Sequence, residues 1–462
     1  MAVVLVLAVA WLAREPAYSA EEKASLAARF EFRELPLASA STARPRSIRA
    51  VAPQLRRIQG WMSSVGAAVA LADADRDGLP NDVCLVDPRT DSVTVAPAPG
   101  TPRRYAPFLL EARPLPYDAA TTAPMGCLPG DFDEDGRTDF LVYYWGRTPV
   151  LFLRDGAELL GAESFERREL AGSRERWYTD TVTSADVDGD GHVDLVIGNY
   201  FRDGSRLLDA RASSDPAMQM QDSMSRAYNA GSDRVYLWEG PGRYREAKDA
   251  LPSEVARGWT LALGASDLDG DLLPELYFAH DFGPDRLLVN RSTPGNVRFA
   301  EVSGRRTLTT AASKVLGRDS FKGMGIDFGD LNADGRLDMM VSNITSELAL
   351  QESNFAWVNT GKRLEPGKAA PFTDRSAPLG LARSGWAWDV KLGDFDNDGT
   401  AEIVQAMGFL RGEVNRWPEL HELTMANDEL LRHPWAWPRF GAGDDLSGRQ
   451  RTAFFVQGPR ER

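Results

Sequence analysis

Six short segments of this sequence carry oxygen-bearing side chains at a fixed spacing. Each begins at an Asp, has Asp, Asn or Glu at its third, fifth and ninth positions, and in most copies has Gly at its sixth. Alternate residues of a tight turn can direct carboxylates inward, and the position 7 carbonyl can complete the six to eight oxygen ligands that a hard cation needs. Glycine allows the backbone to bend between them. We therefore expect these loops to bind calcium as a structural ion, with up to six sites.

The expected ligands are the side chains at positions 1, 3, 5 and 9 and, in five loops, the residue at position 7. They are Asp73, Asp75, Asp77 and Asn81 in loop 1; Asp131, Asp133, Asp135, Arg137 and Asp139 in loop 2; Asp186, Asp188, Asp190, His192 and Asp194 in loop 3; Asp267, Asp269, Asp271, Leu273 and Glu275 in loop 4; Asp330, Asn332, Asp334, Arg336 and Asp338 in loop 5; and Asp394, Asp396, Asp398, Thr400 and Glu402 in loop 6.

The six loops are not equivalent. Loops 2, 3 and 6 have carboxylates at all four side-chain positions, whereas loop 5 has the neutral Asn332 at position 3. Loop 4 has Leu272 where the others have glycine, so its bend must accommodate a side chain. Loop 1 has Asn81 at position 9, with Asp82 one residue later. We expect loop 1 to be the weakest site.

The EF-hand loop begins with a similar pattern but requires a bidentate Glu at position 12 between two helices. No loop has an acidic residue at position 12, and each is followed by a short β-prone run such as residues 140–143. These loops therefore connect strands. A solvated hairpin turn would explain one copy, but six copies in one register favour metal binding.

The loops mark a repeated structural unit. Successive copies begin 58, 55, 81, 63 and 64 residues apart. Each unit has a strand before the loop, a strand after it, a third apolar segment such as residues 150–153, and in several copies a fourth that begins with Phe165, Phe299 or Phe372. Four strands in about 60 residues are typical of a β-propeller blade. We predict an all-β propeller of four-stranded blades that occupies residues 29–462 as one domain.

These units resemble the FG-GAP and VCBS repeats of integrin-α-like propellers. Residues 323–330 and 371–374, followed by residues 379–381 and Gly385-Trp386, more specifically resemble the cartilage acidic protein group. The resemblance covers about residues 29–457 and implies a seven-bladed propeller with calcium in its blade loops and an extracellular or periplasmic binding role. The second half of the FG-GAP signature is not evident, and only six loops are visible, so the blade number stays open between six and seven.

The C-terminal end of the sequence suggests an unfinished repeat. Residues 453–456 are typical of the first strand of another blade, and no C-terminal domain of the UnbV type follows. We therefore expect that a final part is missing at the C-terminus.

The N-terminal residues 1–28 precede the repeats. The apolar run of residues 2–13 is too short to span a bilayer but suits the core of a signal peptide, or the end of a truncated membrane anchor. A buried first strand is the alternative. Either of the first two interpretations places the protein outside the cytoplasm, secreted or attached to the cell surface.

The composition excludes some functions. The net charge of −14 is concentrated in the loops, and no basic stripe with interleaved aromatic residues suggests nucleic-acid binding. Cys84 and Cys127 could form a disulfide or remain buried thiols, and their spacing fits no zinc site.

Two insertions interrupt the repeats and are candidate partner contacts. Residues 203–232 contain Met218, Met220 and Met224, and residues 410–440 contain Trp417, Trp435 and Trp437. Alternatively, these apolar side chains only cover the blade tops.

The sequence lacks the GxSxG, HExxH and clustered His/Cys motifs of common hydrolases and metalloenzymes. We therefore expect a non-enzymatic, monomeric propeller that binds an unidentified protein or glycan, for example in adhesion. The alternatives are a secreted carbohydrate-active enzyme, either a lyase or a hydrolase, and an inert spacer. Two carboxylates that converge in a deep central pocket outside the loops would favour the enzyme, whereas a shallow face with exposed aromatic residues would favour binding.

Overall fold

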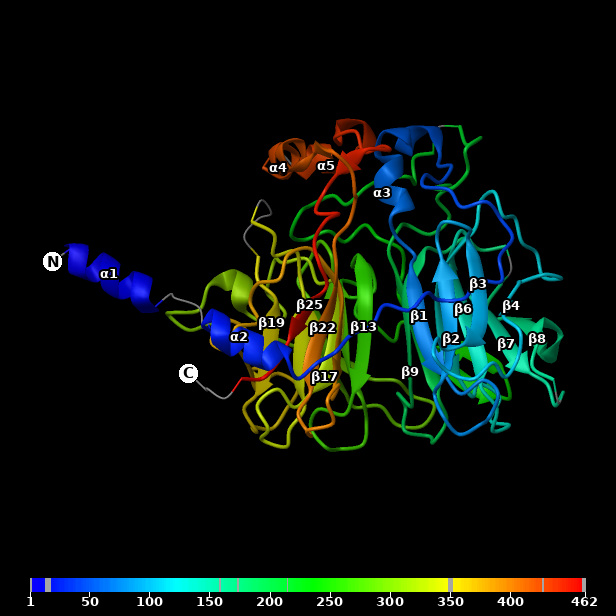
Figure 1. The fold of residues 1–462 in the computed structure, drawn as a ribbon, viewed down its shortest axis with the longest axis horizontal. Helices are drawn as coiled ribbons and strands as arrows, with labels where there is room; N and C mark the ends of the chain where they lie inside the picture. The colour runs from blue at the N-terminus through cyan, green and yellow to red at the C-terminus, as the bar shows by residue number, and fades with distance from the viewer. Residues whose placement is uncertain are drawn as a thin grey trace.

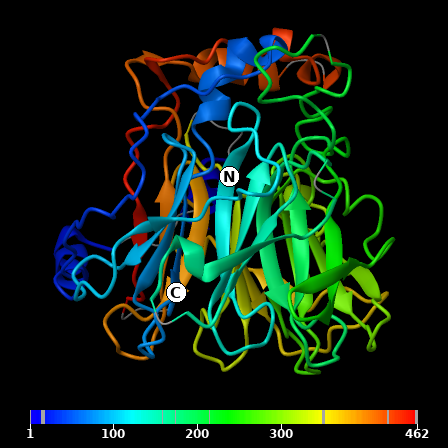
Figure 2. The ribbon, with the colours of Figure 1, turned by 90° about the vertical axis from the view of Figure 1, so that its right-hand side faces the viewer.

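The computed structural model describes residues 2–12, 18–157, 159–172, 174–213, 215–347, 352–425 and 428–458. The protein is an all-β propeller whose six antiparallel blades are arranged around a common axis (Figures 1 and 2). Five blades have four strands, and the sixth has three. Six blades match the six loops, so the structure has one blade fewer than the resemblance implies.

The blades follow one another along the chain. Their strands are β1 (Ala68–Ala72), β2 (Asp82–Asp87), β3 (Ser92–Pro97) and β4 (Phe108–Leu109) in blade 1; β5 (Ala123–Gly130), β6 (Asp139–Trp145), β7 (Val150–Arg154) and β8 (Phe165–Glu169) in blade 2; β9 (Thr179–Ala185), β10 (Asp194–Asn199), β11 (Arg234–Gly240) and β12 (Arg243–Glu246) in blade 3; β13 (Thr260–Ser266), β14 (Glu275–His280), β15 (Arg286–Asn290) and β16 (Phe299–Val302) in blade 4; β17 (Gly325–Gly329), β18 (Asp338–Ser342), β19 (Phe355–Asn359) and β20 (Phe372–Asp374) in blade 5; and β21 (Ala387–Gly393), β22 (Glu402–Met407) and β25 (Ala453–Phe455) in blade 6.

The second strand of most blades is apolar on both sides because it lies between two neighbouring blades. In β6, for example, Phe140 and Val142 pack toward blade 1, while Leu141 packs toward blade 3. All three side chains are fully buried. This two-sided burial explains why these strands read as continuous hydrophobic runs.

The C-terminal strand differs from its prediction. Residues 453–456 were expected to open another blade, but β25 pairs antiparallel with β22, with Ile403 opposite Phe455. It is the third strand of blade 6. The chain leaves this blade after β22 and forms β23 (Val414–Asn415), α4 (Trp417–Thr424), α5 (Asp428–Leu431), η4 (Pro434–Ala436) and β24 (Asp444–Asp445) before it returns.

That excursion forms a cap over one end of the propeller axis (Figure 1). The cap consists of residues 408–452, the segment 201–230, and η1 (Pro53–Ile58) with α3 (Gln59–Ser63), which share one apolar cluster. Met218, Met220, Trp417 and Trp437 are buried in it, whereas Trp435 is 66% exposed. Both insertions therefore cover the blade tops, and their role in partner contact stays a prediction.

A strap, residues 29–46, joins the last blade to the first. Arg29 forms ion pairs with the loop 6 carboxylates, and the rings of Phe30 and Phe32 pack edge-on against Phe454 at centroid distances of 4.9 and 5.1 Å. Further along, the Arg46 N–H donates to the Arg89 carbonyl at 3.0 Å in blade 1. The strap therefore spans the junction between blade 6 and blade 1.

The N-terminal apolar run forms α1 (Ala2–Leu12), whose side chains at residues 2–11 are exposed, so it is not a buried strand. α2 (Ala20–Ala27) follows it. Among the described helices, none combines the length and apolar character needed to cross a bilayer.

The two cysteines form a disulfide between β2 and β5, so the free-thiol alternative is wrong. Because Cys84 lies in blade 1 and Cys127 in blade 2, the bond joins neighbouring blades across a closed loop of 43 residues in sequence. Both side chains are buried in the apolar cluster between the blades.

We expect the double substitution Cys84→Ser, Cys127→Ser to lower the free energy of unfolding by about 2–4 kcal/mol, because a cross-link of this loop length restricts the unfolded chain. Denaturant unfolding of oxidised wild type, reduced wild type and the double variant provides the measurement. Reduced wild type serves as the control, and equal stability of the oxidised and reduced proteins would contradict this account.

Candidate functional site

All six acidic loops lie at one end of the propeller, opposite the cap. Each connects the first and second strands of a blade, as loop 2 connects β5 to β6. Because η1 and α3 of the cap precede β1, that strand runs away from the cap toward loop 1 (Figure 1). The other blades repeat this direction. The molecule thus has an acidic face and a capped face.

The first Asp of each loop folds the loop around its own carboxylate. In loop 2 the Asp131 carboxylate accepts the N–H of Asp135 at 3.0 Å and of Gly136 at 2.9 Å. The same pair of bonds recurs from positions 5 and 6 in the other five loops. One carboxylate therefore fixes the tight bend that the sequence pattern predicts.

The acidic residue at position 9 is buried and ties the loop to the rest of the blade. Asp139 accepts the N–H of Phe132 in its own loop at 2.8 Å and the N–H of Arg154 on the third strand at 2.7 Å. Asp194, Glu275 and Asp338 make equivalent bonds. Burial raises the pKa of Asp139 to about 7. A bound cation would hold this carboxylate ionised.

In loop 1 the structure places Asp82, not Asn81, in the position 9 role. Asp82 is fully buried and accepts the N–H of Ala74 at 2.7 Å. The strand register puts Asp82 opposite Ala72, so one extra residue is accommodated in the loop. Asn81 instead contacts Arg104, which also forms ion pairs with Asp75 and Asp82. This guanidinium supplies positive charge inside the acidic group.

Five of the loops bring three acidic side chains within 4.8 Å of one another, a spacing that can hold a metal ion. The members are Asp73, Asp75 and Asp82; Asp131, Asp133 and Asp139; Asp186, Asp188 and Asp194; Asp267, Asp269 and Asp271; and Asp394, Asp396 and Glu402. In loop 5 the neutral Asn332 stands at position 3. Positions 1, 3 and 9 thus converge in loops 2, 3 and 6. In loop 1 Asp82 takes the place of position 9, and loop 4 contributes Asp271 from position 5.

The position 3 carboxylates fit a cation for a second reason. One oxygen of Asp133, of Asp269 and of Asp396 is buried and lacks a hydrogen-bond partner among the described residues. A buried carboxylate oxygen without a donor is costly, and a metal ion at these positions would satisfy it. At position 5 the side chain instead accepts the N–H of position 7, for example Asp135 from Arg137 at 2.9 Å. The residues named at position 7 therefore hold the bend through their N–H groups.

Loop 4 makes its bend with a side chain present, as expected. Leu272 has φ of +70° and is 88% exposed. The equivalent Gly136 in loop 2 has φ of +79°. A left-handed backbone costs a residue with a Cβ about 1–2 kcal/mol, so loop 4 carries local strain.

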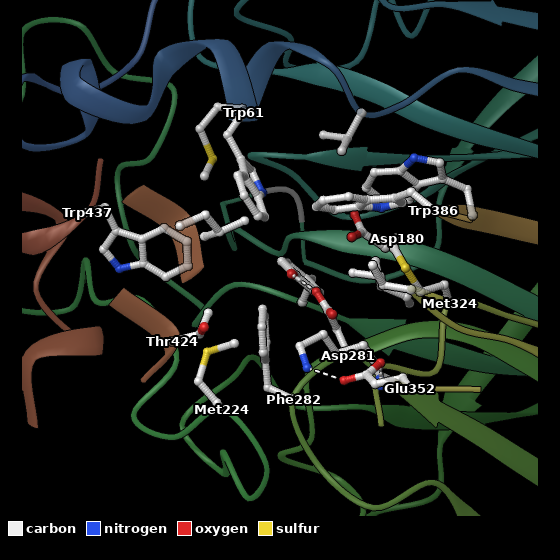
Figure 3. Close-up of a pocket in the computed structure, with 18 of the residues that line it drawn as sticks. Trp61, Asp180, Met224, Asp281, Phe282, Met324, Glu352, Trp386, Thr424 and Trp437 are labelled. Atoms are coloured by element: carbon white, nitrogen blue, oxygen red, sulfur yellow. Dashed lines mark hydrogen bonds and ion pairs between the residues drawn. The ribbon is translucent and has the colours of Figure 1, made fainter. Parts of the chain in front are cut away.

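The capped face holds a partly open pocket on the propeller axis (Figure 3). Its walls are largely aromatic, and its acidic residues belong to none of the six loops. The lining includes Trp61, Trp145, Tyr200, Phe201, Phe282, Trp386, Trp388, Trp417 and Trp437 together with Asp180, Asp281, Lys322, Glu352 and His421. His421 is exposed as well as lining the pocket, which places the mouth of the pocket beside α4.

Two carboxylates, Asp180 and Asp281, point into this pocket from blades 3 and 4 (Figure 3). Asp180 accepts a hydrogen bond from the Trp145 indole N–H, and Asp281 accepts one from the Tyr200 hydroxyl at 2.5 Å. Burial raises the pKa of Asp180 to about 8, and the nearby Asp281 charge adds to this shift. Burial likewise raises the pKa of Asp281 to about 7. Both groups can exchange protons near neutral pH.

Lys322 and Glu352 complete the polar part of the pocket. Their side chains form a buried ion pair, and the Lys322 backbone N–H also donates to Glu352 at 3.0 Å. Trp386, whose side chain is 1% exposed, has an indole N–H without an acceptor among the described residues. Among the described lining residues, Trp386 therefore contributes a buried donor without a partner.

Sequence reasoning missed this pocket because its residues come from separate repeats and follow no short motif. Asp180 lies at the start of β9, and Asp281 lies just after β14. Comparison of the repeats could have found them, since each is an acidic residue at the capped end of a strand. The two carboxylates converge outside the loops, which is the arrangement named above as favouring an enzyme.

Residues 131–197 and 267–341 match the model of the FG-GAP-like repeat, which supports the predicted repeat type. These two stretches contain loops 2 to 5. The match does not support the more specific resemblance to the cartilage acidic protein group. No curated protein matches the sequence.

Solved structures of similar fold include three enzymes. The PQQ-bound aldose sugar dehydrogenase of Streptomyces coelicolor is 15% identical, with 89% of this chain and 99% of that chain covered and a TM-score of 0.36. A rhamnogalacturonan lyase is 12% identical, with coverages of 79% and 75% and a TM-score of 0.31. An ancestral GH74 enzyme is 9% identical, with coverages of 79% and 37% and a TM-score of 0.40.

With TM-scores below 0.5, these similarities assign neither fold nor activity to this chain. The solved structures named here are enzymes, a finding that stands against the prediction that the protein is not an enzyme, and that prediction is withdrawn. That prediction relied on missing serine-hydrolase and zinc-protease motifs. Their absence does not bear on chemistry by paired carboxylates, which needs no local motif.

Replacement of Leu272 by Gly tests the strain in loop 4. We expect Leu272→Gly to raise the free energy of unfolding by about 0.5–1 kcal/mol, because relief of the left-handed strain outweighs the greater flexibility of the unfolded chain. The matched control, Gly136→Leu, places a side chain at the same bend in loop 2 and should be destabilising. Denaturant unfolding measures both, and a destabilised Leu272→Gly would contradict the strain.

The raised pKa values of the pocket carboxylates predict a pH-dependent stability. In the unfolded chain both groups ionise near pH 4, whereas in the folded protein Asp281 ionises at about 7 and Asp180 at about 8. Their stabilising contribution is therefore complete below about pH 4 and is lost as the pH rises through these values. We expect Asp281→Asn to lose less thermal stability than wild type between pH 5 and pH 8. Melting temperatures are measured for both proteins from pH 5 to pH 8. If the two melting temperatures change equally with pH, the raised pKa of Asp281 is refuted.

Proposed function

We propose that the protein is an extracellular, calcium-stabilised propeller that binds a carbohydrate in its axial pocket and hydrolyses a glycosidic bond there. One observation carries the proposal: Asp180 and Asp281 converge in a partly open aromatic pocket, and neither belongs to a metal loop. Pockets with aromatic walls and a few converging polar groups of shifted pKa are typical of ligand and active sites.

The aromatic walls suit the apolar faces of a sugar ring. Trp386 lies 5.9 Å from Trp61 and 5.5 Å from Trp417 between ring centroids, so several indoles meet at one place. The cavity offers about 60 Å³ to the centres of water molecules. That corresponds to about four to six waters, close to the volume of one sugar ring. We therefore propose that a single terminal sugar enters the pocket.

The two carboxyl groups can divide the work of hydrolysis. Asp180 has the higher pKa and is suited to donate a proton to the glycosidic oxygen as the bond to it breaks. Asp281, with the lower pKa, is suited to accept a proton from the water that attacks the sugar. The proton gained by one carboxylate replaces the proton given by the other. The reaction needs no further reactant.

Hydrolysis fits this pocket better than lyase chemistry does. A lyase that acts on a uronic acid must neutralise the carboxylate of its substrate before it removes a proton. Among the described lining residues, Lys322 is the one permanent cation, and it is already paired with Glu352. A uronate would meet Asp180 and Asp281 without a free positive partner.

Calcium is the ion we propose for the loops. The clusters offer carboxylate oxygens only, without His or Cys, and such hard ligands suit calcium. Loops of modest affinity fill where calcium is abundant, outside the cell, and a disulfide is also typical of exported proteins. Because the unfolded chain has no preformed sites, ion binding adds to folding stability.

We expect excess EDTA to lower the melting temperature of protein purified with calcium, and added calcium to restore it. Asp133→Asn removes one of the unpaired position 3 charges and should reduce the shift. Asp75→Asn in loop 1, where Arg104 already supplies positive charge, should reduce it less. The surface substitution Glu239→Gln is the matched control. An unchanged melting curve in EDTA would refute a structural role for metal.

We expect wild type to release a terminal monosaccharide from at least one member of a glycan library, detected by mass spectrometry. Asp180→Asn and Asp281→Asn should each lower kcat at least 100-fold with little change in binding, since each removes one proton-transfer group. Trp388→Ala should weaken binding, whereas Trp435→Ala, outside the pocket, should not. Glycans bound but never cleaved would contradict hydrolysis and leave a carbohydrate-binding protein.

A further inference from the structure

The axial pocket holds more carboxyl groups than cations to pair with them. Its lining acids are Asp180, Asp281 and Glu352, and its permanent cation, Lys322, is paired with Glu352. We propose that the pocket selects a sugar with a protonated amine, namely a terminal amino sugar without an N-acetyl group. This inference rests on the proposed function above and names the substrate class.

Among the described residues, no arginine whose charge acts on the two remaining carboxylates is free to neutralise them. Arg49 is the basic residue whose charge acts on Asp180. Its guanidinium is held elsewhere, by Asp91 at 3.1 and 3.2 Å and by the carbonyls of Met62 at 3.3 Å and Val65 at 3.0 Å. The position of Asp180 therefore remains open to a cation supplied by a ligand.

The hydrogen-bond donors that reach the two carboxylates are neutral, and Lys322, whose charge acts on Asp281, is paired with Glu352. Asp180 receives the indole N–H of Trp145, and Asp281 receives the hydroxyl of Tyr200. Neither donor compensates a full negative charge, so burial shifts both groups toward protonation. An ammonium group between them would favour their ionised forms through attraction that is stronger in a buried site than in water.

The aromatic walls favour the same ligand. A cation over the face of an indole gains about 0.5–2 kcal/mol, most when it is desolvated. The indole of Trp386 lies within 5.9 Å of the indoles of Trp61 and Trp417 between ring centroids. A neutral sugar would gain the stacking alone, and a uronate would add a negative charge beside Asp180 and Asp281.

The unpaired Trp386 indole N–H would allow the pocket to discriminate between an amino sugar and a simple amine. It is a buried donor that needs an acceptor, which a ring hydroxyl supplies and an alkylammonium does not. A ligand that satisfies the whole pocket therefore carries an ammonium group for the carboxylates and a hydroxyl for Trp386. A cavity near the volume of one ring admits both on a single sugar.

The test is isothermal titration of the full-length protein at pH 6.5 with glucosamine, N-acetylglucosamine, glucose, glucuronate and ethanolamine. These ligands have no glycosidic bond, so binding is measured without turnover. We expect glucosamine to bind at least tenfold more tightly than the two neutral sugars, and glucuronate more weakly than either. Asp180→Asn should abolish most of the preference for the amine, whereas Trp435→Ala should retain it.

The outcomes separate the two proposals. Equal or tighter binding of glucose or N-acetylglucosamine would overturn the amino-sugar inference and leave a carbohydrate site. If ethanolamine binds as tightly as glucosamine does, the claim that the pocket recognises the sugar ring would be overturned. No binding of any of the sugars would overturn the carbohydrate function itself. If Asp180→Asn fails to fold, Trp386→Phe removes the indole N–H and should weaken glucosamine without affecting ethanolamine.

Discussion

The structure depends on a buried carboxylate at the ninth position of acidic loops 2 to 6 and, in loop 1, at Asp82, one residue later. In loops 2 to 5 this carboxylate accepts one N–H from the loop and one from the third strand of the same blade, as Asp139 does. The bonds hold the loop, the second strand and the third strand in one register. Ionised, such a group is costly to bury unless positive charge lies beside it. The fold and any cation bound in the loop would therefore be linked through the same carboxylate.

This link divides the molecule into two functional ends. At one end the loops concentrate charge and tie each blade together. At the other end the cap buries large aromatic residues over the axis and covers Asp180 and Asp281. A ligand in the capped pocket does not compete with ions in the loops, because the strands separate them. Residues in the acidic loops can therefore change without affecting the residues of the capped pocket, and the reverse also holds.

The sequence predicts the repeated parts of this structure well and its unique parts poorly. Six loops in one register are enough to indicate strands, blades and oxygen-rich sites, because each copy repeats the same local geometry. Asp82 does not follow the spacing of the other loops. Its position is determined by the pairing of β1 with β2 and cannot be found by counting residues from Asp73. Asp180 and Asp281 could not be paired from sequence, because blade curvature brings them together. β25 becomes the third strand of blade 6 because the chain returns from the cap to pair with β22. No short sequence motif indicates this return.

The late arrival of β25 has a consequence for biosynthesis. Blade 6 receives its third strand only after the chain has passed through the whole cap segment, residues 408–452. The strap, which precedes all six blades in the sequence, finds its Phe454 contact only when β25 has been made. The ring junction between blade 6 and blade 1 therefore forms after the whole cap segment. Until then Phe30 and Phe32 lack Phe454 as a partner.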